Sequence, residues 1–278
     1  MRPLYLAAIA ATVLTFCECS SSYDHITDAS KMVTLQCSTL TVDKEPMTRA
    51  TLADEQMTDL WIFDGATQLI HQTSSDADFG APTLPLSYGE HELHLVATRI
   101  ANATITGGIL TGDNPRATFG QHLTLGVSPQ TAKTQTVQLA RQTYQLTITA
   151  DDEWPASYGH LEVSIAPEYV TYNVMTSAGG TSTTPKAHTV TPPATWAGTT
   201  GCYYTVHGFA PSADEFTATV TWTLYAADDV TILQQHTIAD VPLQKNYRTL
   251  LHGDFFAKSP AFSVSLDNSW AGDKDVTL

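Results

Sequence analysis

Residues 58–72 read TDLWIFDGATQLIHQ, and this stretch is the clearest guide to the fold. Apolar residues fill 60–63, Asp64-Gly65 follows, and a second run of alternating character ends at Gln72. Asp-Gly between two such runs is a strong signal for a tight turn between antiparallel strands. The stretch therefore predicts a β-hairpin with strands at 59–63 and 68–72.

The same alternation continues on both sides of this hairpin. Upstream, residues 31–42 (KMVTLQCSTLTV) place Val33, Leu35, Cys37 and Thr39 on one face of a strand. Downstream, residues 83–99 (TLPLSYGEHELHLVATR) predict a second hairpin that turns at 88–90. Its return strand places one set of side chains on one face (Leu93, Leu95, Ala97) and another on the opposite face (Glu92, His94, Thr98).

The rest of the chain repeats short strands separated by turn residues. We expect a Gly-rich loop at 105–116, strands at 117–127 and 134–139, and a new set of strands from about residue 141. Residues 176–201, rich in Gly, Pro, Ser and Thr, predict a long surface loop, and 216–226 with 231–238 predict a hairpin. Many short strands with a turn about every ten residues are typical of β-sandwiches. The sequence thus predicts an all-β protein with two tandem sandwiches, at 31–141 and 142–278.

The N-terminus has the features of an export signal. Arg2 precedes an apolar run from Leu4 to Phe16, which is too short to span a bilayer. We expect residues 1–16 to be a signal peptide of the lipoprotein type, with Cys17 as the lipidated first residue and Cys19 as the alternative. Residues 17–30 would then be a polar tether. Ordinary secretion, with both cysteines removed, is the other interpretation.

Composition excludes several classes of partner. The chain has 13 Lys and Arg against 28 Asp and Glu, a net charge of −15, so a nucleic-acid partner is not expected. Only Cys37 and Cys202 lie in the body of the chain, far apart in sequence. Two buried free thiols are favoured over a disulfide, which an oxidising compartment would permit.

No catalytic or metal-binding pattern emerges. His91 and His94 are three apart on a predicted strand, which puts them on opposite faces and makes a poor metal site. The motifs of serine hydrolases, zinc proteases and nucleotide-binding loops do not occur. No enzyme activity, metal or cofactor is therefore predicted. Among the five tryptophans, Trp61 and Trp222 fit strand cores, while Trp196 in the long loop is the candidate for contact with a ligand or partner.

Several short motifs, in order along the chain, resemble the fimbrillin-type pilus proteins of anaerobic oral and gut bacteria, including their anchor and accessory lipoproteins. They are the lipoprotein-like start at Cys17, residues 47–65 (MTRATLADEQMTDLWIFDG), residues 241–256 (VPLQKNYRTLLHGDFF) and residues 262–270 (FSVSLDNSW). The resemblance implies two transthyretin-like β-sandwich domains and a lipidated precursor sent to the outer membrane. It also implies assembly with other fimbrial subunits by donor-strand pairing.

The resemblance further implies a processing site. In polymerising members a trypsin-like protease cuts after an Arg in the first domain, and here Arg49 matches by position, so Ala50 would become the new N-terminus. Anchor members are not cut and keep the lipid. The tail after Trp270 is short and polar, which makes it a weak donor strand and favours an anchor or accessory role.

The sequence therefore predicts a non-enzymatic, lipid-anchored fimbrial subunit at the cell surface, with host or bacterial surface molecules as further possible ligands. A surface glycan-binding lipoprotein is the main alternative, since it would also be β-rich and carry tryptophans. A secreted hydrolase with two close carboxylates is the third.

Overall fold

The computed structural model describes residues 30–41, 48–51, 57–113, 115, 117–181, 187–212, 215–257 and 261–267. Within these residues the backbone is almost entirely β-strand, with one 3-10 helix, η1, at Ala194–Trp196. No helix in the described part of the chain has the length and apolar character needed to cross a membrane. The prediction of an all-β protein is confirmed.

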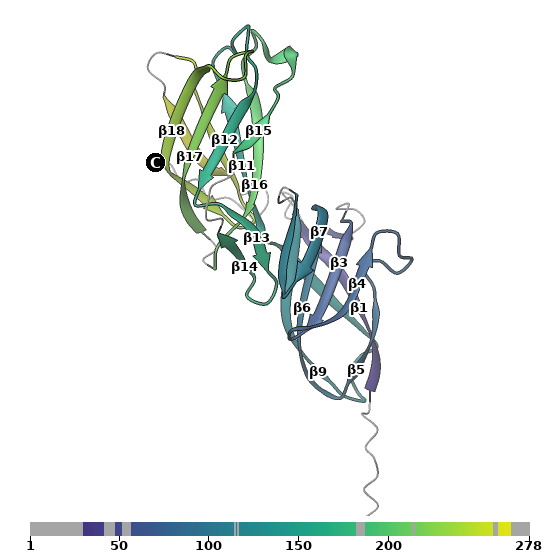
Figure 1. Cartoon of the computed structure of the whole chain (residues 1–278). Coiled ribbons are helices and arrows are strands. Elements are labelled where there is room, and N and C mark those ends of the chain that lie inside the picture. Colours follow the sequence, from purple (N-terminus) through teal and green to yellow (C-terminus); the bar gives the residue numbers. More distant parts are fainter. Residues whose placement is uncertain are drawn as a thin grey trace, which may run out of the picture.

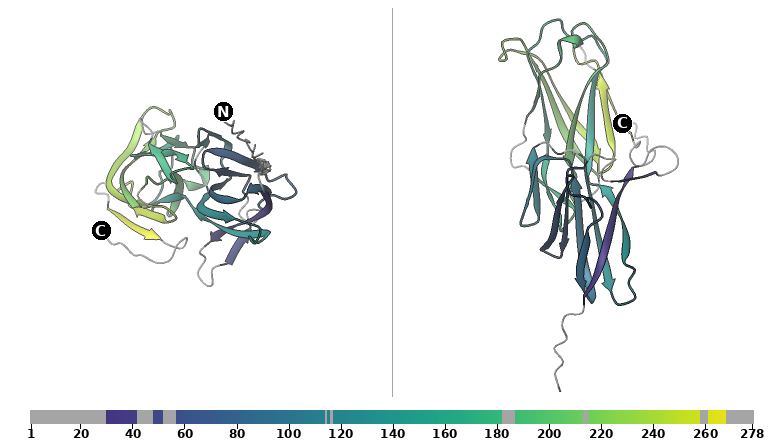
Figure 2. Two further views of the ribbon diagram at one scale, coloured as in Figure 1. Left: turned by 90° about the horizontal axis from the view of Figure 1, so that it is seen from below. Right: turned by 90° about the vertical axis from the view of Figure 1, so that its right-hand side faces the viewer.

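The strands form two lobes placed end to end (Figures 1 and 2). The first half of the chain contributes β1 (Ser30–Thr41), β2 (Thr48–Thr51), β3 (Asp59–Asp64), β4 (Thr67–Thr73), β5 (Thr83–Ser87), β6 (Gly89–Thr98), β7 (Ala101–Thr106), β8 (Ile109–Asp113), β9 (Thr118–Val127) and β10 (Thr134–Arg141). The second half contributes β11 (Thr143–Ala150), β12 (Leu161–Ala166), β13 (Tyr169–Asn173), β14 (Ala178–Thr181), β15 (His188–Val190), β16 (Cys202–Phe209), β17 (Glu215–Tyr225), β18 (Ile232–Gln244), β19 (Arg248–Gly253) and β20 (Phe262–Asp267).

The first lobe is one sheet of eight strands folded around a core. The strand order is β2-β1-β10-β9-β6-β3-β4, with β5 paired to β1. β10 connects the part of the sheet that contains β1, β2 and β5 to the part that contains β9, β6, β3 and β4. It pairs with β1 over residues 134–139 and with β9 only at Ala140 and Arg141. The alternate inward residues of these strands make one apolar cluster drawn from residues 33–139.

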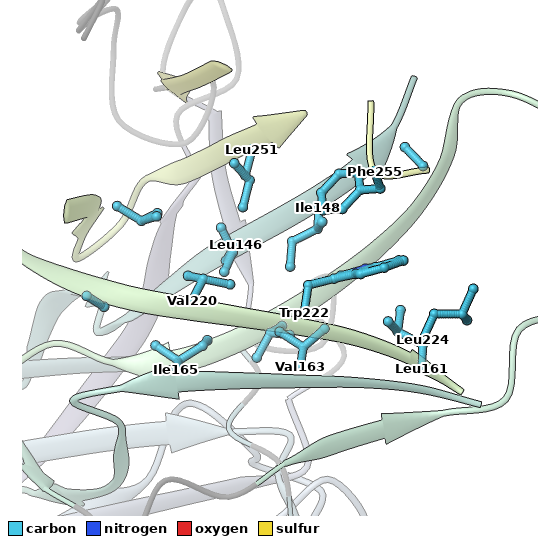
Figure 3. Packing of buried hydrophobic residues seen from close by; sticks show 14 of the residues in the cluster. Leu146, Ile148, Leu161, Val163, Ile165, Val220, Trp222, Leu224, Leu251 and Phe255 are labelled. Carbon is cyan, nitrogen blue, oxygen red and sulfur yellow. The ribbon is translucent and has the colours of Figure 1, made fainter. Parts of the chain in front are cut away.

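The second lobe is a sandwich of two four-stranded sheets. Their orders are β16-β11-β19-β20 and β15-β12-β17-β18. Figure 3 shows the side chains of β11, β12 and β17 meeting between the layers, with Trp222 in the middle of the cluster. Trp222 is 1% exposed and Trp61 is 3% exposed, so the prediction that both are core residues is confirmed.

A fourth sheet joins the lobes. Its order is β14-β13-β8-β7, so that two strands come from each half of the chain. A separate apolar cluster lies at this junction and also draws on both halves: Trp61, Phe63, Val96, Ile100 and Leu110 from the first, and Tyr172, Val174 and Phe209 from the second. The predicted domain boundary at residue 141 stays a prediction, because strands and core residues from either side of it share this junction.

Two of the predicted hairpins are confirmed. β3 and β4 pair around Asp64-Gly65, and Gly65 has a φ of +51°, which the tight turn requires. β17 and β18 pair around the turn that includes Asp229.

The predicted hairpin at 83–99 is wrong. β5 and β6 are strands, but β5 pairs with β1, whereas β6 pairs with β3 and β9. Pro85 explains why β5 takes an edge position, since proline has no N–H to donate to a second neighbour. Gly89, with a φ of +136°, lets the chain change direction between the two strands.

Two segments expected to be loops contain strands. Residues 105–116 include the end of β7, the turn at Gly107 and Gly108, both with positive φ, and the whole of β8, which pairs with β7. Residues 176–201 include β14, β15 and η1. Segments rich in Gly and Thr are expected to form loops. Here, pairing with a neighbouring strand outweighs that local preference.

Candidate functional site

The first strand, β1, lies inside its sheet and has partners on both sides. One edge pairs in parallel with β10, from Thr34 with Thr134 to Thr39 with Leu139. The other edge pairs with β5 over residues 30–34 and with β2 over residues 38–41. A strand near the N-terminus thus completes the sheet, although almost all of the remaining fold follows it in sequence (Figure 1).

One face of β1 supplies part of the first lobe's core. Val33 and Leu35 are 0% exposed and Cys37 is 6% exposed, as the alternation predicted. The side chain of Thr39, the fourth residue of that predicted face, lies outside the described residues. Burying a branched aliphatic side chain is worth roughly 1.5–3 kcal/mol, so Val33 and Leu35 together contribute about 3–6 kcal/mol to the stability of this lobe.

The start of β1 is also held by a polar contact. The Lys31 ammonium donates hydrogen bonds to three carbonyl oxygens of the β9–β10 turn: Pro129 at 2.6 Å, Ser128 at 3.5 Å and Thr131. An ammonium group has three hydrogens, so these acceptors use its full donor capacity. Lys31 therefore connects the beginning of β1 to the β9–β10 turn by hydrogen bonds.

The predicted processing residues, Arg49 and Ala50, lie in β2. This short strand is at the edge of the sheet, and its register pairs Arg49 with Leu40 and Ala50 with Thr39. An edge strand leaves one row of backbone groups unpaired. Cleavage after Arg49 would break the covalent connection between β1 and the strands that follow it in sequence. Pairing and packing alone would then hold β1 in place.

A groove opens beside β1's partner, β10. Over residues 134–139, β10 pairs with β1 and is separated from β9, and a cavity of about 410 Å³ lies between β9 and β10. Its walls alternate apolar and polar side chains: Gln121, Leu123 and Leu125 from β9, and Gln135, Thr136, Val137, Gln138 and Ala140 from β10. Leu123 and Leu125 are half-buried and also pack against the first lobe's core. The alternating residues of 117–127 and 134–139 predict these two strands, but nothing in the sequence indicates that they diverge.

The reactivity of the Cys37 thiol indicates whether β1 is in place. Burial raises the pKa of its thiol from 9.0 to about 12. Because only the thiolate reacts with alkylating agents, a rise of three pH units lowers the reactive fraction about a thousandfold at pH 8. Cys37 and Cys202 are both buried free thiols, as the sequence favoured.

We expect iodoacetamide at pH 8 to leave Cys37 unmodified in the intact protein and to alkylate it rapidly once β1 is displaced. Peptide mapping by mass spectrometry would read each cysteine separately. Cys202, buried in the other lobe, is the internal control, and it should stay protected while β1 is displaced. Fast alkylation of Cys37 in the intact protein would contradict the placement of β1 in the core.

The other predicted site residues lie elsewhere. Cys17 and Cys19 fall outside the described residues, so lipidation stays a prediction. Trp196 is half-buried and packs edge-on against Trp154, with ring centroids 4.8 Å apart. Its predicted contact with a ligand or partner is not tested by this packing and also stays a prediction.

His91 and His94 lie on opposite faces of β6. His91 contacts the Asp64 carboxylate at 2.6 Å, whereas the His94 ring stacks on His122 with centroids 4.4 Å apart. Burial and the neighbouring His122 lower the pKa of His94. Within the described residues, no group of three or more His, Cys, Asp or Glu side chains is arranged to hold a metal ion.

Solved structures with a similar fold come from species of Bacteroides. A candidate cell adhesion protein from Bacteroides ovatus matches with a TM-score of 0.53 and 12% identity, over 88% of this chain and 100% of that one. A candidate polysaccharide-binding protein from Bacteroides thetaiotaomicron matches with a TM-score of 0.51 and 13% identity, over 86% and 96%. At these identities the similarity shows the fold.

The fimbrial anchor protein Mfa2 from Porphyromonas gingivalis also matches, with a TM-score of 0.44 and 10% identity, over 86% of this chain and 98% of that one. That similarity is too low to bear on function. No curated protein matches the chain.

One protein family matches most of the chain. The match runs over residues 86–278, from the end of β5 onward, so it includes β9 and β10 but neither β1 nor β2. The chain therefore belongs to DUF6562, a family of unknown function.

Proposed function

We propose that this protein is a non-enzymatic subunit of a cell-surface fimbria, anchored by a lipid on Cys17 and joined to neighbouring subunits by strand pairing at the position of β1. The role is that of an anchor or accessory subunit. The observation that supports it most directly is β1 itself. β1 lies near the N-terminus, buries Val33, Leu35 and Cys37, has partners on both edges and is followed by Arg49 in the edge strand β2, so it is a segment that a neighbour's strand can replace.

Without β1, the first lobe would have an unpaired strand edge and an exposed part of its apolar core. The inner edge of β10 would lose its partner along residues 134–139, and the cavities left by Val33 and Leu35 would expose apolar core. Unpaired edges and exposed apolar grooves both favour pairing with an incoming strand. A strand from another subunit, with alternating apolar and polar residues, would restore the same pairing and burial.

The fold comparison is consistent with a surface role. A candidate cell adhesion protein shares this fold along its full length. In the second lobe, the β17–β18 hairpin ends in exposed apolar side chains, with Val230 78% exposed and Ile232 49% exposed. Apolar side chains gathered at the end of a lobe suit contact with another protein.

The test is the intact mass and N-terminal peptide map of the protein isolated from its native outer membrane. We expect an acylated N-terminus at Cys17 with Arg49 uncut, so that an incoming strand would displace β1 while the lipid stays covalently joined to the subunit. An N-terminus at Ala50 would instead support a polymerising subunit, while an unlipidated N-terminus within residues 18–30 would contradict the lipid anchor. Cross-linking in the same membranes should join the first lobe to another fimbrial subunit. Recovery of the chain only as a free monomer would refute the fimbrial role.

A further inference from the structure

A second cavity, which we term the junction pocket, lies where the two lobes meet. Its volume is about 220 Å³, and its lining comprises Arg99 and Pro115 from the first half and His188, Tyr204, Thr205, Val206 and His207 from the second. A cavity of this size is below the range typical of drug-sized ligands, so it suits a single small unit.

Free sheet edges of the second lobe border the junction pocket. β15, which carries His188, is the terminal strand of one sheet, and β16, which carries Tyr204 to His207, is the terminal strand of the other. Arg99 and Pro115 belong to the segments next to β6 and β9 of the first lobe, and the Arg99 N–H donates to the Ala117 carbonyl at 3.3 Å. The pocket therefore exists only because the two lobes are joined.

The junction pocket is lined by one arginine and two histidines, whereas the chain as a whole is acidic. The chain carries a net charge of −15, yet no Asp or Glu is among the residues that line this pocket. Arg99 is exposed, and no described residue forms an ion pair or hydrogen bond with its guanidinium group. An unpaired guanidinium presents five N–H donors in a planar fork that matches a carboxylate.

His188 is held in a fixed orientation at the wall of the pocket. Its Nε2 lies 2.5 Å from the Glu168 carboxylate, and the two side chains are only 9% and 2% exposed. Within the described residues, Nδ1 of the same ring has no hydrogen-bond partner. A ring whose one nitrogen is bound to a buried carboxylate offers the other nitrogen in a defined direction, as carboxylate-oriented histidines do in metal sites.

We propose that the junction pocket binds an acidic monosaccharide, with its carboxylate on Arg99. The two N–H donors of a guanidinium edge can bind both carboxylate oxygens, which is the strongest arrangement for this pair. Thr205 and the free nitrogen of His188 supply hydrogen-bonding groups for hydroxyls, and Pro115 supplies apolar wall, while the side chains of Tyr204 and Val206 face the second lobe's core. A pyranose ring, with polar edges and an apolar face, fits such a mixed lining better than an inorganic anion does. This ligand site is independent of strand pairing at β1.

The test uses the full chain and ligand-observed NMR titrations with glucuronate, glucose and N-acetylglycine. We expect glucuronate to bind in the millimolar range and both glucose and N-acetylglycine to bind about tenfold more weakly or not at all. Glucose lacks the carboxylate, and N-acetylglycine has a carboxylate but no sugar ring. Arg99→Gln should weaken glucuronate binding by about tenfold or more, the scale of one charge-assisted hydrogen-bonded contact.

Lys133→Gln is the matched control. Lys133 is exposed near the start of β10 and does not line the junction pocket, so this substitution removes one positive charge without touching the site. We expect it to change glucuronate binding by no more than about twofold. Circular dichroism of both variants checks that the fold is kept.

Equal weakening by Arg99→Gln and Lys133→Gln would overturn the proposal, because it would mean general electrostatic attraction. Equal binding of glucose or N-acetylglycine, or no binding of glucuronate, would overturn it as well. None of these results changes the expected N-terminus or the cross-links of the native protein, so this site and the fimbrial role can fail separately.

Discussion

Removal of residues 1–49 is expected to unfold the first lobe, and a peptide of residues 30–41 is expected to restore it. The buried side chains of Val33 and Leu35 alone account for about 3–6 kcal/mol. That is comparable to the whole stability of an ordinary domain, about 5–15 kcal/mol. The second lobe should stay folded, because its core draws on residues beyond 143.

The experiment places a site-specific protease sequence directly after Arg49. Cleavage alone should leave the fold unchanged, since β1 is still paired with β10 and β5. Gel filtration in mild denaturant should then release the N-terminal piece, and alkylation of Cys37 and binding of a hydrophobic dye should follow that release. An uncleavable version of the inserted sequence is the control for the insertion.

The added peptide distinguishes strand pairing from a general loss of stability. The peptide of residues 30–41 should restore near-native circular dichroism and suppress dye binding. A control peptide with Val33→Asp and Leu35→Asp keeps the backbone but cannot enter the apolar core, so it should have no effect. If both peptides restored the lobe equally, or if neither did, β1 would not be a replaceable strand.

The second large effect is expected at the junction of the lobes. Phe209 is 1% exposed, stacks on Tyr172 at 5.2 Å and belongs to the cluster that joins the two halves. Phe209→Ala should cost about 3–5 kcal/mol, the usual range for a buried Phe. Because the loss falls on shared core, we expect the two lobes to unfold in separate transitions and to move relative to each other.

Calorimetry and small-angle X-ray scattering would measure these two consequences. The matched control is Phe255→Ala, which removes a fully buried ring from the second lobe's own core. It should destabilise that lobe by a similar amount while leaving the scattering profile unchanged. Identical calorimetric and scattering changes in the two variants would contradict a separate junction core.

Backbone contacts across the junction explain why it is expected to be rigid in the intact protein. β8 and β13 pair through Tyr172 with Leu110 and Asn173 with Ile109, and the Val174 N–H donates to the Gly108 carbonyl at 2.9 Å. Strand pairing fixes both distance and direction, which apolar packing alone does not. The junction pocket depends on this rigidity because its walls come from both lobes.

Local sequence signals predicted the structure correctly where it depends on residues close together in sequence, as in a hairpin or along one strand. The β3–β4 hairpin follows from Asp64-Gly65, and the buried face of β1 follows from strict alternation at Val33, Leu35 and Cys37. In each case the turn chemistry or the two-residue period of a strand acts over a few residues. The same local signal failed at 83–99, because it shows two strands joined by a turn but not which strands they pair with.

By itself, the sequence determined the class of the protein: an acidic, all-β chain with many short strands, two buried thiols and a first strand with one apolar face. Only the tertiary structure decided that β5 pairs with β1, that β9 and β10 diverge, and that Arg99, His188 and His207 line one cavity. Alternation and turn residues are local properties, whereas strand partners are set by which edges and apolar faces remain unsatisfied after the whole chain has packed.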